Sequence, residues 1–424
     1  MDKASTGQNG PCRANRLLYI GMHYWPEETG AGPYASGIAE HLSSRGWNVT
    51  MLTGMPYYPY WRVFDSYRGK WRLKEHRCGV EIRRFHHYIP NQQNAVSRAL
   101  FDLTFLVHAL PTALRPVLVG APRPDLILAD IPALSDGVLA AIAARRFGVP
   151  FGIIYHDLVA PGARQTGIAG GAQIAAATRS LEGWIARQAR KIAVISEGMR
   201  PYLRGLGVPD ERIILAPFWP NVQESTRAPD EARAALGWSA EEQVVLHAGN
   251  LGLKQGLENV VDAARLAHAA SSRLQFVFLG DGNQRPMLER RAAGLPNVTF
   301  LDPMPAADFP NALAAADILL LNERPSLLDM CLPSKLMSYL VAGRPIVAAV
   351  APDGVSAEVV EQSGAGLVVP AGEPPALLST LDRVATDTAL AARLAVAGPG
   401  YAREHLGKDV SLTRYERFAC DLLL

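Results

Sequence analysis

A lysine stands inside a glycine-rich turn, HAGNLGLKQGLENV, that directly follows a run of apolar residues. Glycine lets backbone N–H groups approach a ligand closely, and this turn has three glycines: Gly249, Gly252 and Gly256. Lys254 adds a flexible ammonium beside the start of a helix, which suits a diphosphate. Asn250 could hydrogen-bond the same ligand, although an asparagine here more often stabilises the turn. A solvated surface lysine is the alternative interpretation of Lys254.

A second phosphate-binding candidate is the stretch LPSKLMSYLVAGRPIV. Pro333 and Ser334 are typical of a helix start, so Ser334 and Lys335 would offer a hydroxyl, free N–H groups and a cation at one N-terminus. Ser334 acting only as a helix cap is the alternative. Because Lys254 and Lys335 both follow strands of the same predicted domain, we expect both at one sheet edge, where a ligand would bind.

The first half of the chain has its own turn of this kind. Gly30 and Gly32 lie between a predicted strand and a helix that begins near Pro33 or Tyr34. The helix N-terminus could hold an anion, but the spacing is not a full G-x-G-x-x-G, and a tight strand-to-helix turn explains the glycines equally well. Further along, His156 and Asp157 form a His-Asp pair at a predicted strand end, which alone is a weak site signal.

A basic and aromatic segment, residues 57–90, follows the second predicted strand. Its aromatic residues include Tyr57, Tyr58 and Trp61, and its basic residues include Arg68, Lys70 and Arg72. This mixture suits anionic lipid head groups, so the segment, with apolar helix candidates over residues 95–118, could dock the protein on a membrane carrying a lipid-linked acceptor. The alternative is an insertion packed on its own domain.

Short apolar β-branched runs alternate with helical stretches along the whole chain, and the candidate residues follow these runs. This alternation is typical of parallel βαβ units. The first half contains five predicted strands: 17–22, 49–53, 126–129, 151–155 and 192–195. The second half contains six: 244–248, 275–279, 298–301, 318–321, 346–349 and 367–369. Helices are predicted over 35–45 and 138–147, and at the end over 411–424.

The pattern predicts an α/β protein with two consecutive Rossmann-like, doubly wound domains and a cleft between their facing strand ends. We expect a disordered leader over 1–15, an N-terminal domain over 16–217, a Pro-rich linker over 218–230, a C-terminal domain over 231–400 and a helical tail over 401–424.

Composition narrows the function classes. The 424 residues contain 42 Lys+Arg against 40 Asp+Glu, which does not favour a nucleic-acid partner. The four cysteines are far apart in the sequence, so no metal site is expected. Reduced, unpaired cysteines fit a cytoplasmic location, which we also expect. No transmembrane segment is predicted, because charged residues and prolines interrupt the most apolar stretch, residues 101–121. A dehydrogenase is disfavoured because neither half has the full dinucleotide fingerprint.

Four motifs together resemble the GT-B glycosyltransferases of family four, and within them the colanic-acid type enzymes of bacterial exopolysaccharide synthesis. They are Tyr24-WPEETGAGPY, Met55-PYYPYW, Gly249-NLGLKQGL and Leu332-PSKLMSYLVAGRPIV. The resemblance implies a retaining, metal-independent transfer from a nucleoside diphosphate sugar, GDP- or UDP-linked, with no cofactor. The donor would lie in the C-terminal domain. A saccharide or lipid-linked acceptor would lie against the N-terminal one, with attachment to the inner membrane face a further expectation.

The resemblance also assigns residues. Lys254 would stabilise the leaving diphosphate, His156 would lie near the anomeric centre with Asp157 beside it, and the loop of Gly30 and Gly32 would approach the donor.

The sequence departs from the family at two places. Asn250 replaces the arginine that usually precedes the lysine, and the E-x7-E pair is missing. The available acids are Glu323, Asp329 and Glu358, of which Glu358 is the first choice. Two other functions stay open on the sequence: an epimerase acting on nucleotide sugars and a non-catalytic nucleotide-sugar binding partner of a polysaccharide complex.

Overall fold

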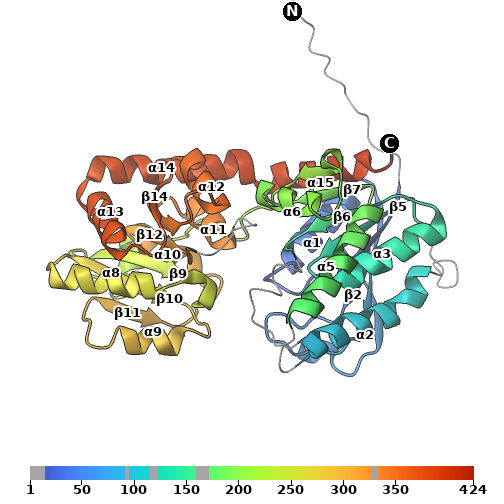
Figure 1. Ribbon diagram of the computed structural model, residues 1–424, viewed down its shortest axis with the longest axis horizontal. Helices are drawn as coiled ribbons and strands as arrows, with labels where there is room; N and C mark the ends of the chain where they lie inside the picture. The colour runs from blue at the N-terminus through green and yellow to red at the C-terminus, as the bar shows by residue number, and fades with distance from the viewer. Residues whose placement is uncertain (1–14, 91–94, 115–122, 159–170, 326–332) are drawn as a thin grey trace, which may run out of the picture. The chain divides into compact units, whose positions relative to one another are not determined.

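The computed structural model describes residues 15–90, 95–114, 123–158, 171–325 and 333–424. The chain divides into two compact units (Figure 1). The N-terminal unit comprises residues 1–218 and 411–424, and the C-terminal unit comprises residues 219–410.

A largely parallel sheet forms the centre of the N-terminal unit. Among the described residues it has eight strands in the order β3-β4-β2-β1-β5-β6-β7-β8. Only β3 pairs in the antiparallel sense. The strands are β1 (Arg16–Ile20), β2 (Asn48–Gly54), β3 (Arg72–Arg77), β4 (Val80–Phe85), β5 (Leu126–Ile131), β6 (Phe151–Tyr155), β7 (Lys191–Val194) and β8 (Ile213–Leu215).

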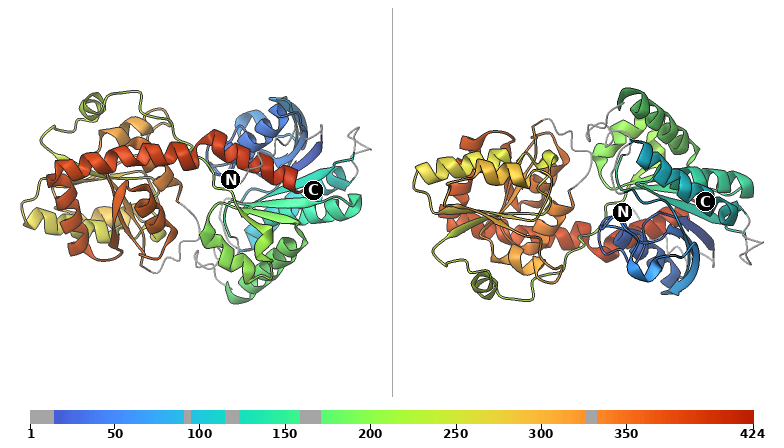
Figure 2. Two further views of the ribbon diagram at one scale, coloured as in Figure 1. Left: turned by 90° about the horizontal axis from the view of Figure 1, so that it is seen from above. Right: turned by 90° about the horizontal axis from the view of Figure 1, so that it is seen from below.

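Helices cover both faces of this sheet. They are α1 (Gly32–Ser44), α2 (Ala95–Leu114), α3 (Leu134–Phe147), α5 (Gly171–Gln188), the short α6 (Arg200–Arg204) and α15 (Lys408–Asp421), with 3₁₀ turns η1 (Asp65–Tyr67), η3 (Glu197–Met199) and η4 (Asp210–Arg212). Figure 2 shows α1 and α15 on one face and α2, α3 and α5 on the other. Because both faces are covered, strands such as β5 are buried at every residue.

The C-terminal unit has a second parallel sheet with a Rossmann strand order. Its six strands among the described residues run β11-β10-β9-β12-β13-β14. They are β9 (Gln243–Ala248), β10 (Leu274–Leu279), β11 (Val298–Leu301), β12 (Ile318–Asn322), β13 (Ile346–Val350) and β14 (Gly366–Pro370). The helices are α7 (Pro229–Ala235), α8 (Glu258–Ala269), α9 (Arg285–Arg291), α10 (Phe309–Ala315), α11 (Ser334–Ala342), α12 (Val355–Ser363), α13 (Pro374–Thr386) and α14 (Thr388–Leu406), with the 3₁₀ turn η5 (Leu253–Gln255).

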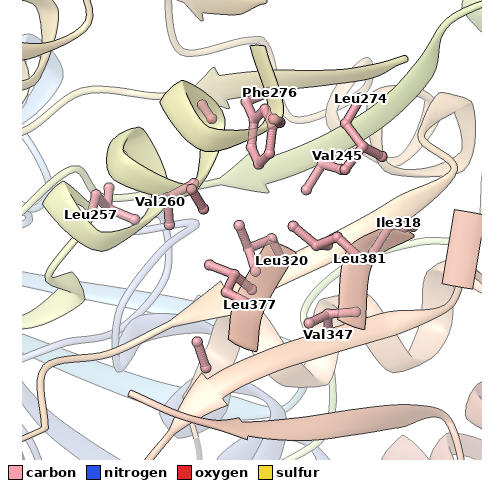
Figure 3. Close-up of a cluster of buried hydrophobic side chains, with 14 of the residues drawn as sticks. Val245, Leu257, Val260, Leu274, Phe276, Ile318, Leu320, Val347, Leu377 and Leu381 are labelled. Atoms are coloured by element: carbon pink, nitrogen blue, oxygen red, sulfur yellow. The ribbon is translucent and has the colours of Figure 1, made fainter. Parts of the chain in front are cut away.

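Two apolar cores lie on opposite faces of this second sheet. In one, strand residues such as Val245, Phe276 and Leu320 pack against α8 and α13, as Figure 3 shows. In the other, the alternate strand residues pack against α10, α11, α12 and α14. Alternation along each strand sends successive side chains to opposite faces, so the sheet is held rigidly and its strand ends are fixed relative to one another.

The structure confirms the two Rossmann-like α/β halves, and all eleven predicted strands are present within one or two residues of their predicted ends. Three strands were missed. β3 and β4 form a hairpin inside the basic segment, and β8 is only three residues long. Alternating charged residues hid β3, because an edge strand can be polar on both faces. The predicted cleft between the two domains stays a prediction.

Helix α15 packs on the N-terminal unit, although nearly 200 residues separate it in sequence from the rest of that unit. The Tyr415 hydroxyl donates a hydrogen bond to the Ala216 carbonyl oxygen at 2.5 Å. Phe418 and Leu422 occupy the space in front of Gly152 on β6, where any Cβ would collide with them. The chain therefore completes its first unit with its last residues.

Candidate active site

The strand order of the C-terminal sheet reverses between β9 and β12, which are neighbours although β10 and β11 separate them in sequence. Ligands of doubly wound sheets bind at the carboxyl ends of the strands at such a switch point. The turn that contains Lys254 follows β9, and α11, which begins at Ser334, follows β12. The two lysine-bearing segments therefore lie at the same edge of one sheet.

Lys254 lies in η5, exposed to solvent. Its backbone carbonyl accepts a hydrogen bond from the Arg324 N–H at 3.1 Å, which ties the turn to the segment after β12. Gly256 ends η5 with a φ of 55°, a conformation that glycine adopts without strain. Within the described residues, no hydrogen bond or ion pair holds the Lys254 ammonium. The cation is thus free to meet an anionic ligand.

Asn322, at the end of β12, holds the Lys254 turn in place by hydrogen bonds. Its amide Nδ2 donates to the carbonyl oxygens of Gln255 at 2.7 Å and Gly256 at 3.0 Å. Its Oδ1 accepts from Asn259 of α8 at 2.8 Å, so the amide is satisfied while fully buried. Sequence reasoning missed this residue, although a polar side chain ending the apolar run ILLLN was a usable signal.

Lys335 has a partner in the sheet itself. Its Nζ lies 2.7 Å from Nε2 of His247, a fully buried residue of β9. Its side chain crosses Gly249, whose φ is 125° and where an added Cβ would come within 3.1 Å of Lys335 Cε. Gly249 therefore makes room for the lysine as well as for the turn, and His247 is a second residue that the sequence did not single out.

Burial sets the protonation of this pair. Desolvation lowers the pKa of Lys335 to about 7, against an opposing attraction from the carboxylate of Glu323. Desolvation first, and then the charge of Lys335, hold the pKa of His247 well below its usual value. The imidazole is therefore neutral, and its Nε2 accepts a hydrogen bond from the lysine ammonium. An anion bound beside Lys335 would favour the charged lysine further.

The acids after β12 and β13 differ in their environments. Glu323 is 7% exposed, and its Oε1 accepts a hydrogen bond from the Ser356 hydroxyl at 3.3 Å. Glu358, the first choice from the sequence, is exposed on α12 and accepts a hydrogen bond from Gln362 one turn later. Glu323 is thus the acid that acts on Lys335, whereas Asp329 lies outside the described residues.

The remaining predicted donor residues take simple positions. Pro333 is the N-cap of α11 and Ser334 its first residue, exposed, so Ser334 is not the helix cap that the alternative interpretation proposed. Asn250 is exposed, with its side chain against Gly252 and Gly282, where a Cβ on either glycine would lie 2.7 Å from it. Both residues are open to a ligand.

In the N-terminal unit, the order of the sheet reverses between β1 and β5, and the Gly30–Gly32 turn follows β1. Gly32 begins α1, and an added Cβ there would lie 2.6 Å from the carbonyl oxygen of Glu27. The Glu27 carboxylate is buried and accepts the backbone N–H groups of Tyr57 at 2.8 Å and Tyr58 at 2.9 Å. Glu27 therefore shapes the turn that precedes α1.

His156 follows β6, but its carboxylate partner is not its sequence neighbour. Nε2 of His156 lies 3.3 Å from Oδ2 of Asp130, at the end of β5. Asp157 is exposed and accepts a hydrogen bond from the next backbone N–H, that of Leu158, at 2.7 Å. His156 thus has an acidic partner on the neighbouring strand, because parallel strand ends bring 130 and 156 together.

The His156 ring is enclosed by aromatic side chains. Phe218 lies 4.5 Å away between ring centroids and stacks on Tyr34 at 4.2 Å. The other Asp130 oxygen accepts from the Tyr19 hydroxyl at 2.7 Å. Over the described part of the chain, Nε2 of His156 and Oδ2 of Asp130 are both buried and neither has an aligned hydrogen-bond partner. The two atoms therefore face each other as an ion pair without a well-aligned hydrogen bond.

The aromatic residues predicted for the acceptor or membrane side differ in how deeply they are buried. Tyr57 is 2% exposed, and its hydroxyl lies 3.2 Å from Nε2 of His23, so it cannot contact a membrane directly. Tyr58 and Trp61 are partly exposed beside it, with ring centroids 6.5 Å apart.

The predicted basic residues of this side lie at the surface. Arg68 pairs with Asp65 at 3.0 Å, Lys70 lies 5.4 Å above the Tyr67 ring, and Arg72 begins β3, all of them exposed.

Known proteins match the chain along most of its length. Residues 29–219 match the family model of the glycosyl transferase 4-like domain, and residues 242–387 match that of the glycosyl transferases group 1. The chain is 29% identical over 339 residues to the putative colanic acid biosynthesis glycosyl transferase WcaI of Escherichia coli K12, covering 77% of this chain and 81% of that protein. No described helix is both long and apolar enough to cross a membrane.

Solved structures share the fold. Sucrose-phosphate synthase from Thermosynechococcus elongatus superposes with a TM-score of 0.70 at 19% identity, covering 96% of this chain and 99% of that one. HepE from Anabaena, solved in complex with UDP-glucose, gives a TM-score of 0.67 at 19% identity, covering 96% and 100%. With a glycosyl transferase 4-like domain over 29–219 and a group 1 domain over 242–387 on two Rossmann-like sheets, this chain is a glycosyltransferase of the GT-B fold.

Proposed function

We propose that this glycosyltransferase transfers a sugar from a nucleoside diphosphate donor to a saccharide or lipid-linked acceptor in cell-surface polysaccharide synthesis, with retention of configuration and without a metal. The observation that carries the donor half of the proposal is the gathering of Lys254 and Lys335 at the switch point of the C-terminal sheet. Relatives support it: HepE binds UDP-glucose, and WcaI is named for colanic acid biosynthesis.

The chemistry asked of the two lysines is charge stabilisation. The bond from the anomeric carbon to the diphosphate breaks, the acceptor hydroxyl oxygen bonds to that carbon, and the hydroxyl proton is released. Negative charge grows on the departing diphosphate while the sugar becomes oxocarbenium-like, so a positioned ammonium lowers the barrier. Lys254, unpaired among the described residues, and Lys335, held by His247, are the proposed groups.

His156 is the proposed catalytic side chain of the N-terminal unit. It is held by packing against Phe218, and its Nε2 and the facing oxygen of Asp130 are buried polar atoms with unused hydrogen-bonding capacity among the described residues. A sugar hydroxyl can donate to one and accept from the other, which would satisfy both. Asp157, exposed beside His156, would contact the ligand from the solvent side. Glu323 is proposed as the acid of the donor site in place of Glu358.

The proposal is tested with a panel of GDP-, UDP-, dTDP- and ADP-linked sugars in the presence of EDTA, followed by thermal shift and by donor hydrolysis. We expect stabilisation by one nucleotide class, GDP or UDP, that survives EDTA. Product from the selected donor and a lipid-linked oligosaccharide pool, analysed by NMR, should keep the anomeric configuration. Loss of activity with EDTA or an inverted product would contradict the metal-independent and retaining parts, respectively.

Binding of a nucleotide sugar without hydrolysis or transfer to any acceptor would instead favour the non-catalytic binding partner. Conversion of the donor to a different nucleotide sugar would favour an epimerase.

A further inference from the structure

Arg324 lies beside the Lys254 turn and has no role in the site described above. It comes two residues after β12, and its backbone N–H donates to the Lys254 carbonyl oxygen at 3.1 Å. Its side chain packs over Gly256, where an added Cβ would lie 2.8 Å from Arg324 Cγ. Because β12 and β9 are the two strands at the switch point of this sheet, Arg324 lies where ligands of doubly wound sheets bind.

A carboxylate of the neighbouring helix holds the Arg324 guanidinium. Nη2 donates to Oε1 of Glu258 at 2.8 Å, and Glu258 is the first residue of α8, the helix that follows the Lys254 turn. The side chains of Arg324 and Glu258 are 37% and 36% exposed. An ion pair that is this exposed contributes little to stability, because water competes for both charges. The fold therefore gains little from keeping Arg324 beside Glu258.

The pair with Glu258 uses only part of the guanidinium. Nε of Arg324 is buried, and within the described part of the chain it has no hydrogen-bond partner. A guanidinium can donate two parallel N–H groups to a phosphate, so Arg324 has donor capacity for such a ligand. Glu258, in the first turn of α8, occupies the positive end of the helix dipole, where an anion is favoured. The carboxylate thus lies in a position that a phosphate could take instead.

The two lysines leave a diphosphate incompletely balanced. Both phosphates of a nucleotide sugar are negatively charged, whereas burial lowers the pKa of Lys335 to about 7 and the carboxylate of Glu323 acts on that lysine. Asn250, exposed on the same turn as Lys254, is neutral. Arg324 brings a further cation to this sheet edge, and its planar fork matches phosphate oxygens better than an ammonium does.

We propose that Arg324 binds the diphosphate of the nucleotide sugar and leaves Glu258 to do so, an assignment that rests on the donor function proposed above. In the free protein Glu258 holds the guanidinium and so competes with the diphosphate for it. Loss of Glu258 should therefore strengthen donor binding, whereas loss of Arg324 should weaken it. If the pair were only structural, both losses would break the same contact and would change donor binding in the same direction.

Calorimetric titration of the full-length protein with UDP, GDP, dTDP and ADP measures the effect of each substitution. For the diphosphate that binds the wild type, Arg324→Gln should raise the Kd about tenfold or more, because charge-assisted hydrogen bonds to a phosphate are lost. Glu258→Gln should lower the Kd by up to about fivefold, since the carboxylate no longer competes for the guanidinium. In the Arg324→Gln protein, Glu258→Gln should lose most of this effect, because it acts through Arg324.

Arg291→Gln is the matched control, because Arg291 pairs with Asp262 on the same helix at 2.7 Å and is similarly exposed. It should leave the Kd of the diphosphate unchanged. Asn250→Arg places a guanidinium on the same turn as Lys254, so it should restore part of the affinity that Arg324→Gln loses. Thermal unfolding of each variant checks that the fold is intact.

Diphosphate binding that Arg324→Gln leaves unchanged would overturn the assignment while the donor site stands. So would changes of Kd in the same direction for Arg324→Gln and Glu258→Gln, because they indicate a structural pair. A wild-type protein that binds none of the four diphosphates would contradict the donor site itself, and the role of Arg324 would fail with it.

Discussion

At the scale of single residues, the two lysines of the donor site work in opposite environments. Lys254 is exposed at the tip of a turn, while Lys335 is drawn into the sheet edge against His247. The charge of a desolvated lysine depends on what binds beside it. Lys335 is therefore expected to make donor binding depend on pH.

Lys254→Ala is expected to lower kcat about 100-fold while changing the free energy of unfolding by less than about 0.5 kcal/mol. The reason is that the exposed side chain supports the leaving diphosphate and not the fold. Steady-state kinetics and urea unfolding measure the two quantities. Lys408→Ala, at a lysine that lies over the Trp219 ring in the same unit, is the control and should leave kcat unchanged. Equal turnover of Lys254→Ala and the wild type would remove Lys254 from the site.

Donor affinity is expected to fall as pH rises through about 7, where the free protein loses the Lys335 proton. Because burial lowers the pKa of Lys335 to about 7, the lysine is charged below that pH and neutral above it. Above that pH the lysine must take up a proton when the donor binds, which lowers the donor affinity by up to about tenfold per pH unit. The groups that act on Lys335 among the described residues are His247, neutral throughout, and Glu323.

Calorimetric titration of a nucleotide sugar from pH 6 to 9 measures this dependence. A nucleotide sugar is the suitable probe because its diphosphate does not titrate in that range. Lys335→Met should bind more weakly and show a flat profile. A wild-type profile that is equally flat would contradict the assignment.

At the scale of elements, the Lys254 turn depends on β12 beneath it. Asn322→Asp is expected to weaken donor binding and to lower the free energy of unfolding by about 1–3 kcal/mol, because two backbone carbonyls lose their donor and face a carboxylate instead. Asn297→Asp breaks a similar buried amide bond, to the Ala264 carbonyl, away from this turn. It should cost similar stability and leave the donor Kd unchanged. If both variants bind the donor equally well, the turn does not need its anchor.

At the scale of the whole molecule, the N-terminal unit is completed by the last helix of the chain. Phe418→Ala is expected to cost about 3–5 kcal/mol of the stability of that unit, because the ring is 2% exposed and fills the space before Gly152. Scanning calorimetry with and without donor nucleotide separates the units, since the ligand should raise the transition of the unit that binds it. The transition that the nucleotide does not raise should move down.

Leu381→Ala, in the core of the C-terminal unit, should move the other transition. A Phe418→Ala protein with unchanged calorimetry would mean that α15 is not integral to the first unit.

The sequence by itself determined the two Rossmann-like halves, because β-branched apolar runs and helical stretches repeat with a period that local physics dictates. It also placed the two glycine-bearing turns and the lysines after their strands, since turn chemistry is local. It missed β3 and β4, because alternation of charged residues over 72–84 conceals an edge hairpin.

Only the tertiary structure decided which side chains meet. His247 and Lys335 are separated by 88 residues, and the strands that carry or precede them become neighbours only through the crossover of the sheet. The same applies to Asp130, which pairs with His156 across neighbouring strands, and to Glu323, whose burial no local pattern reveals. Spacing along the chain fixes what a turn can do, whereas strand order and burial fix the partner and the charge of each group.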